Sequence, residues 1–245
     1  MKKIIFATLC GFLAQLSHAE ENDLRARYIT SVLNEVVPHV KIVDVKESEL
    51  PGLYQVNLES GIVYASGDAK FVLQGDLLEV VNHKIVNRTE NALGVKRAGL
   101  LAKFNTADMI VFKPKTKSKH DLTIFTDVDC GFCQRQHQEV PKLVAAGITV
   151  RYIPYPRTGT DSETANKMRR VWCSQDRAKA LTTAKSGGAI DSASHSSCAA
   201  AEAAVAAGYA LGQKVGVNGT PAIYTNTGKQ IGGYLSAESI ISTLE

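Results

Sequence analysis

Two cysteines separated by two residues, placed between a strand pattern and a helix pattern, restrict most strongly how this chain can fold. Buried-strand residues fill 122–126, a short turn follows, and Cys130 and Cys133 open a helical pattern that continues through His137. A second β-rich run covers 148–153. The order strand, CxxC, helix, strand therefore places both thiols at the start of a helix beside a sheet.

This context favours a thioredoxin-like redox pair over a metal site. Zinc would require a second close pair of ligands, whereas Cys173 and Cys198 have 198 − 173 − 1 = 24 residues between them. At a helix N-terminus, unpaired N–H groups and the positive end of the helix dipole stabilise a thiolate. We therefore expect Cys130 to attack disulfides and Cys133, one turn further along, to resolve the mixed disulfide.

Three neighbours of the pair allow alternative interpretations. Asp129 places a negative charge directly before Cys130, which opposes the thiolate unless the carboxylate points away. Phe132 either offers an apolar surface to unfolded substrates or packs as a loop aromatic. His137 follows on a similar helix face, and we interpret it as a partly exposed histidine rather than a redox participant.

The N-terminus has the pattern of a cleavable secretory signal peptide. Two lysines follow Met1, an apolar stretch covers 4–16, and small residues precede a cleavage site before Glu20. A membrane anchor would need about 20 apolar residues, more than this run contains. Cys10 lacks the small preceding residue of a lipoprotein signal. We therefore predict secretion with removal of 1–19.

Loss of Cys10 with the leader leaves four of the five cysteines in an oxidising compartment, where an even count favours disulfides. Four cysteines allow three pairings. Because Cys130 and Cys133 form a local redox pair, the natural remaining pair is Cys173 with Cys198. The sequence thus predicts one redox pair and one structural disulfide.

The region after the leader predicts a small α+β unit. Apolar residues recur at helical spacing over 23–37, before Pro38. Short β-rich runs separated by turn residues follow at 40–45, 53–58, 62–65, 71–73 and 77–81. We interpret His39 and His83 as surface residues, and this region has no catalytic constellation. A further helix is predicted over 89–104.

Composition excludes several other classes of protein. Hydrophobic residues make up 44% and charged residues 21% of the chain, which argues against a disordered or multi-span membrane protein. The formal net charge is only +4, so no nucleic acid partner is expected. Thiol chemistry of this kind is expected to need no cofactor and no metal.

Near the C-terminus, Pro221 directly precedes a β-rich run. Proline is tolerated at the beginning or the edge of a strand, and an X–Pro bond can be cis. The sequence alone leaves the isomer of the Thr220–Pro221 bond open.

These features together resemble the DsbC/DsbG family of bacterial periplasmic thiol:disulfide interchange proteins, which are disulfide isomerases. The resemblance rests on the signal peptide, the small α+β unit, the connecting helix, Phe-Thr-Asp at 125–127, the Cys-Gly-Phe-Cys motif and Gly-Thr-Pro at 219–221. It covers essentially the whole mature chain. The motif departs from the family at Phe132, where the usual residue is Tyr, and we expect this change to alter redox poise rather than mechanism.

The resemblance implies a V-shaped homodimer joined through the N-terminal units, with an apolar cleft that holds misfolded chains. It implies that Pro221 is cis, that Thr220 and Pro221 pack against Cys130, and that the Thr220 backbone pairs with an extended substrate. It also implies that Cys173 and Cys198 form a structural disulfide in a helical insertion.

We therefore expect an α+β chain with four segments. These are a signal peptide at 1–19, a cystatin-like dimerisation domain at 20–88, a linker helix at 89–105 and a thioredoxin-like catalytic domain at 106–245. The catalytic sheet is expected to use 122–126, 148–153, 223–225 and 230–232, with a helical insertion over 160–216. Ser236 is expected to cap the last helix.

The favoured activity is that of a periplasmic disulfide isomerase or reductase, kept reduced so that the Cys130 thiolate attacks wrong disulfides in secreted proteins. A DsbA-type oxidase carries the same motif without the N-terminal unit. A chaperone would depend on the cleft rather than on the cysteines. The resemblance also implies recycling by a DsbD-like inner-membrane reductase.

Overall fold

The computed structural model describes residues 4–190 and 198–245, with side chains from Glu20 onward within those ranges. The chain divides into two compact units, Met1–Thr89 and Glu90–Glu245. Each unit packs helices against a sheet that is wholly or mainly antiparallel. The predicted α+β class is confirmed.

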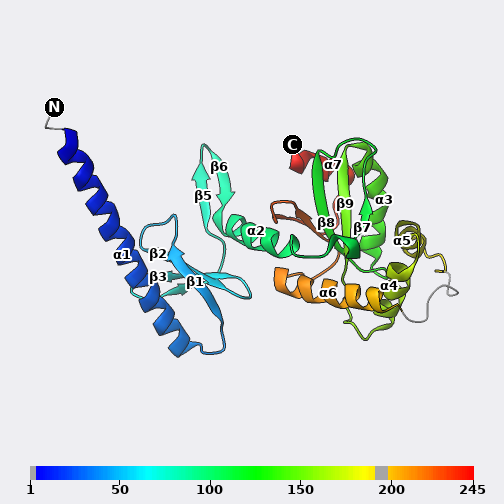
Figure 1. Ribbon diagram of the computed structural model, residues 1–245, viewed down its shortest axis with the longest axis horizontal. Helices are drawn as coiled ribbons and strands as arrows, with labels where there is room; N and C mark the ends of the chain where they lie inside the picture. Colours follow the sequence, from blue (N-terminus) through cyan, green and yellow to red (C-terminus); the bar gives the residue numbers. More distant parts are fainter. Residues whose placement is uncertain (1–3, 191–197) are drawn as a thin grey trace. The chain divides into compact units, whose positions relative to one another are not determined.

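The N-terminal unit consists mainly of one long helix against a four-stranded antiparallel sheet. Helix α1 (Ile4–Val36) packs on this sheet, whose strand order is β1-β2-β3-β4 (Figure 1). The strands are β1 (Ile42–Glu47), β2 (Leu53–Leu58), β3 (Ile62–Ser66) and β4 (Val72–Leu73). Their buried core is small and comprises Ile29, Leu33, Tyr54, Val56 and Ala65.

Helix α1 begins earlier than the sequence predicted. The periodic segment 23–37 ends as expected, near Val36, but the helix runs without a break from Ile4 through most of the predicted leader. In the part of the chain that the structure describes, no helix is both long enough and apolar enough to cross a membrane. Cleavage of the leader stays a prediction.

A two-stranded hairpin of β5 (Leu78–Val81) and β6 (Lys84–Asn87) completes this unit. Its turn has positive φ angles at Asn82 (49°) and His83 (62°), a conformation that matches a two-residue turn to the twist of its strands. The sequence analysis missed β6, which is only four residues long. His83 and His39 are exposed, as predicted.

The C-terminal unit is built on a five-stranded sheet with the order β11-β10-β8-β9-β7. Strands β8 (His120–Thr126) and β9 (Ile148–Pro154) run parallel, and the other neighbours are antiparallel. The remaining strands are β7 (Ile110–Phe112), β10 (Ala222–Thr225) and β11 (Gln230–Gly232). The four predicted strands are confirmed, whereas β7 at the sheet edge was missed.

Helices flank this sheet. Helix α3 (Gly131–Ala145) follows β8 and lies beside α7 (Ala237–Leu244) (Figure 1). The hydroxyl of Ser236 accepts a hydrogen bond from Ser239 N at 3.2 Å, so the predicted cap of α7 is confirmed. A short 3-10 helix, Thr106–Asp108, precedes β7.

The predicted helical insertion contains α4 (Glu163–Cys173), α5 (Arg177–Lys185) and α6 (Ala199–Val215). Helix α4 packs against both of the others. Residues 191–197, which fall within this insertion, lie outside the described residues.

Helix α2 (Arg88–Leu101) belongs to the C-terminal unit from Glu90 onward. Gly94 lies against the β10–β11 turn, where a Cβ on Gly228 would come within 2.1 Å of the Gly94 carbonyl oxygen. The carboxylate of Glu90 accepts the Gln230 N–H at 2.9 Å. The Arg97 guanidinium lies 5.7 Å from the centre of the Tyr224 ring. The helix predicted as a linker therefore packs closely on the sheet it precedes.

Candidate active site

The two thiols of the CxxC motif lie at the start of α3. Strand β8 ends at Thr126, a three-residue loop follows, and Cys130 occupies the N-cap position with an extended backbone (φ −84°, ψ 116°). Cys133 lies in the first turn of the helix. Both cysteines are free thiols, and their side chains are almost fully buried.

The electrostatic surroundings separate the two thiols. Burial acts to raise the pKa of Cys130, but interactions with Thr220 and Cys133 and the positive charge of Arg157 outweigh it, so this pKa is lowered. Burial raises the pKa of Cys133, and the charge of Lys185 only partly opposes that effect. The thiol at the helix N-cap is therefore the more easily ionised of the two.

The loop that carries Thr220 and Pro221 faces the pair. The peptide bond between these two residues is cis. The Cys130 thiol donates a hydrogen bond to the Thr220 carbonyl oxygen at 3.2 Å. The Thr220 hydroxyl is buried and has no hydrogen-bond partner among the described residues. It is thus available to donate to a thiolate once one of the cysteines ionises.

A groove of about 350 Å³ runs beside this loop. Phe132, Thr220 and Pro221 all line it, so the structure brings together the three residues predicted to bind substrate. Tyr234 also lines the groove, and its ring centre lies 6.5 Å from that of Phe132. The sequence analysis did not single out Tyr234, because a tyrosine after two glycines carries no local signal of its position.

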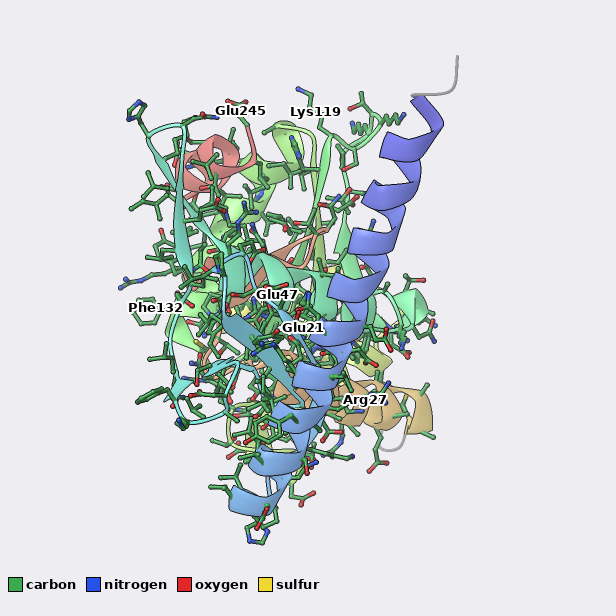
Figure 2. The ribbon with its side chains drawn as sticks, turned by 90° about the vertical axis from the view of Figure 1, so that its left-hand side faces the viewer. Glu21, Arg27, Glu47, Lys119, Phe132 and Glu245 are labelled. Atoms are coloured by element: carbon green, nitrogen blue, oxygen red, sulfur yellow. A yellow bond between two sulfur atoms is a disulfide. The ribbon has the colours of Figure 1, made fainter. Side chains whose placement is uncertain are left out.

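Phe132 does not pack into the loop. Its side chain is 57% exposed, and Figure 2 shows the ring standing clear of the ribbon. The Arg135 guanidinium lies 5.6 Å from the ring centre, within range of a cation–π contact. An exposed aromatic ring therefore borders the groove.

The charge of Asp129 is directed to the insertion rather than to Cys130. Its carboxylate accepts hydrogen bonds from Thr164 Oγ1 at 2.7 Å and from Lys167 Nζ at 3.2 Å, both on α4. This pairing answers the question that the sequence left open, because a carboxylate paired with an ammonium opposes the nearby thiolate less than a lone one.

Asp127 organises the loop before the motif. Its buried carboxylate accepts hydrogen bonds from Asp129 N at 2.8 Å, Arg157 N at 3.0 Å and Arg157 Nε at 3.2 Å. The sequence analysis missed both Asp127 and Arg157 as parts of the site, since their contact joins the end of β8 to the segment after β9.

His137 is buried, so the prediction of a partly exposed histidine is wrong. One ring nitrogen lies 3.2 Å from the Tyr152 hydroxyl on β9, and the other lies 3.0 Å from Thr182 Oγ1 on α5. Burial, with a contribution from the charge of Lys185, lowers the pKa of His137 to about 4. The imidazole is therefore neutral near pH 7, and the helix face that looked exposed is covered by α5.

The other two cysteines are joined by a disulfide, with Cα atoms 5.8 Å apart. Cys173 ends α4 and Cys198 lies at the N-cap of α6. Within the described residues, no group of three or more His, Cys, Asp or Glu side chains is placed to hold a metal ion.

Both units match known protein families. Residues 107–245 match the thioredoxin-like domain, and residues 15–90 match the N-terminal domain of disulfide bond isomerase proteins. Two free thiols at the head of a helix in a thioredoxin-like domain place this chain among the thiol:disulfide oxidoreductases.

Two curated relatives indicate a narrower family within this class. The chain is 34% identical over 247 residues to the thiol:disulfide interchange protein DsbC of Dickeya dadantii (strain 3937), covering 100% of this chain and 96% of the relative. It is 35% identical over 195 residues to DsbC of Escherichia coli (strain K12), covering 80% and 78%. The chain belongs to the DsbC family of thiol:disulfide interchange proteins, as the sequence motifs predicted.

A solved structure supports the fold. A linker-deletion variant of Proteus mirabilis ScsC superposes with a TM-score of 0.53 at 20% identity, covering 63% of this chain and 82% of that one. At this identity the likeness supports the fold alone.

Proposed function

We propose that this protein rearranges incorrect disulfides in secreted proteins, using Cys130 as the nucleophile and Cys133 as the resolving thiol. The Cys130 thiolate attacks a substrate disulfide, a Cys130–substrate disulfide forms, and one substrate sulfur leaves as a thiolate. That thiolate can attack another disulfide of the same substrate. In isomerisation a substrate thiolate finally displaces Cys130, so the enzyme ends reduced.

The observation that carries this assignment is the opposite direction of the two pKa shifts. Cys130, at the helix N-cap, has a lowered pKa, whereas burial raises that of Cys133. A thiolate is the attacking species in exchange, so the more readily ionised thiol is the better nucleophile near neutral pH.

Substrate is proposed to bind along the groove beside the cis-proline loop. The Thr220 backbone is expected to pair with an extended substrate chain, with Pro221 packed near the thiol. The exposed ring of Phe132 would contact apolar side chains of an incompletely folded protein. This role is supported by the position of all three residues along one groove.

The N-terminal unit is proposed to join two copies of the chain into a homodimer. Exposed apolar side chains on its hairpin and β4 provide a surface that a second copy would cover. The cleft between two catalytic units would hold misfolded chains in a chaperone-like manner. The predicted signal peptide supports a periplasmic location, where a DsbD-like reductase would return the pair to its dithiol state.

The experiment that tests this proposal is thiol trapping of Cys130 and Cys133 in intact cells. An isomerase is expected to be mostly reduced, because only a thiolate can attack a wrong disulfide. A mostly oxidised pair would instead identify an oxidase. Replacement of Cys133 by Ser should accumulate mixed disulfides through Cys130, and faster alkylation of Cys133 than of Cys130 at mildly acidic pH would reverse the assigned roles.

A further inference from the structure

Lys185, the last residue of α5, buries its side-chain nitrogen against the segment that leads into the CxxC motif. The residue is only 5% exposed. Its Nζ donates hydrogen bonds to Thr126 Oγ1 at 2.7 Å and to the Asp127 carbonyl oxygen at 3.3 Å. Among the described residues these partners are neutral oxygens, and burying an ammonium without a charged partner is costly, so burial lowers the pKa of Lys185. A negative charge that appeared nearby would therefore be stabilised strongly.

The carboxylates around this ammonium already have other partners. Asp127 directs its carboxylate to Arg157, and Asp129 directs its carboxylate to Lys167 and Thr164. The thiols are the other acidic groups whose charge acts on Lys185, and Cys133 acts more strongly than Cys130. The thiolate of Cys133 is thus the anion best placed to compensate the buried ammonium.

The remaining polar neighbours do not change charge near pH 7. His137 on α3 has a pKa lowered to about 4, mainly by burial. Burial also raises the pKa of Tyr152 on β9, whose ring centre lies 5.9 Å from Lys185 Nζ. Arg157 keeps its positive charge. The charge that changes beside Lys185 during exchange is therefore that of the thiols.

We propose that Lys185 is a positioning residue that stabilises the Cys133 thiolate in the step that releases substrate from Cys130. In this step Cys133 Sγ attacks Cys130 Sγ, the Cys130–substrate bond breaks, and a Cys130–Cys133 disulfide forms. The substrate sulfur leaves as a thiolate and takes up the proton that Cys133 lost. The substrate disulfide has then gained two electrons and the cysteine pair has lost two. This inference rests on the proposed function of the pair.

The position of Lys185 at the end of a helix supports this role. The C-terminal end of α5 carries the negative end of the helix dipole, which favours a cation there. The ammonium is also held by two hydrogen bonds from the segment that leads into the motif. The side-chain nitrogen is therefore fixed in place before the mixed disulfide forms.

The first test replaces Lys185 by Met, which keeps an unbranched side chain of similar length without the charge. In a Cys130→Ser background, the thiolate absorbance of Cys133 is titrated with pH. Lys185→Met should raise the Cys133 pKa by about one unit or more, as expected for loss of a close opposite charge. In the otherwise unchanged protein, release of a trapped mixed disulfide should slow about 10-fold.

Lys179→Met is the matched control, because Lys179 is exposed on the same helix. It should leave both the Cys133 pKa and the release rate unchanged. A folded Lys185→Met protein with the pKa and release rate of the parent would overturn the proposal. These readouts follow the thiols themselves, so they stay informative even if the protein proves not to be an isomerase.

A second measurement uses the unaltered chain and therefore does not depend on the stability of a variant. The Lys185 side chain is followed by NMR titration in the dithiol and the disulfide forms. Oxidation removes both ionisable thiols, so no thiolate can form beside Lys185, and the Lys185 pKa should be lower in the disulfide form than in the dithiol form. The same Lys185 titration in both redox states would contradict the proposed charge pairing.

Discussion

The two units of this protein differ in how completely they bury their apolar side chains. Where side chains are described, the C-terminal unit has two extensive buried clusters, whereas the N-terminal unit has one small cluster between α1 and its sheet. Among the described side chains, the N-terminal unit exposes large apolar residues on most of its elements: Leu24, Tyr28, Val36, Val37, Val43, Leu50, Phe71, Val72, Leu73, Leu78, Val80 and Ile85. The C-terminal unit exposes Val95, Phe132 and Tyr234.

This difference indicates that the two units have different roles. An exposed apolar surface of this extent is typical of an association surface. In the C-terminal unit, two of the three exposed large apolar side chains border the groove beside the thiols. We therefore assign association to the N-terminal unit and exchange chemistry to the C-terminal unit.

The largest effect is expected at the nucleophile. Cys130→Ser should reduce both disulfide rearrangement and reduction by roughly 1,000-fold or more, because a hydroxyl is a far weaker nucleophile than a thiolate. Assays with a scrambled multi-disulfide substrate would measure this loss. Sedimentation should be unchanged, since no residue of the N-terminal unit is altered. A shift in oligomeric state would contradict the assignment of association and exchange chemistry to separate units.

The disulfide of the insertion should contribute to stability and not to exchange. Replacing Cys173 and Cys198 together by Ala opens a loop of about 26 residues, which the chain-entropy model values at about 3.5 kcal/mol. Denaturant unfolding should show this loss in the C-terminal unit. Exchange at a permissive temperature should persist, and its absence in a folded variant would place these cysteines in the redox pathway.

Low pH should destabilise the folded C-terminal unit, because His137 is buried in its neutral form. Its pKa is lowered from 6.5 to about 4 in the folded chain, so the unfolded state binds more protons between these values. The stability that comes from keeping His137 neutral is therefore fully present above pH 6.5. As the pH falls towards 4, the free energy of unfolding decreases by up to about 3 kcal/mol.

Unfolding free energies measured from pH 7 to pH 4 would test this dependence. His137→Gln should remove most of the slope, whereas His39→Gln, at an exposed position of the other unit, should leave it intact. A slope that persists in His137→Gln would assign the acid sensitivity to another group.

The smallest of these effects is expected from the hairpin of the N-terminal unit. Val80 and Ile85 face each other across β5 and β6 and are 75% and 71% exposed. Changing both to Asp should give a monomer by sedimentation and lower disulfide rearrangement about 10-fold, through loss of the shared cleft. Simple dithiol reduction should be retained. Lys84→Asp is the control, and a variant that still sediments as a dimer would exclude this face as the interface.

Local patterns were sufficient to predict most of the fold. Strand β2 and strand β11 have the predicted boundaries, and the CxxC motif opens a helix between two strands as expected. Strand β7 was missed because its three residues are identified only by pairing with β9. The early start of α1 was missed because the apolar run was interpreted as a leader.

The site was predictable where it is local in sequence and not where it depends on long-range burial. The CxxC motif and the Thr220–Pro221 pair can each be recognised from a few consecutive residues. Lys185 lies 59 residues from Thr126 in sequence, so no local pattern indicates their contact. A lysine near the end of a helix is normally interpreted as a solvated side chain. His137 was misplaced for the same reason, since the residues that cover it belong to α5 and β9.

The insertion contacts the loop before the motif at two places, through α4 at Asp129 and through α5 at Thr126 and Asp127. Two proteins with identical Cys-Gly-Phe-Cys tetrapeptides can therefore differ in redox behaviour if their insertions differ. Ranking relatives by the tetrapeptide alone would overlook this source of diversity. Laboratory evolution of such enzymes can accordingly sample α4 and α5 while the cysteines and the residues between them stay untouched.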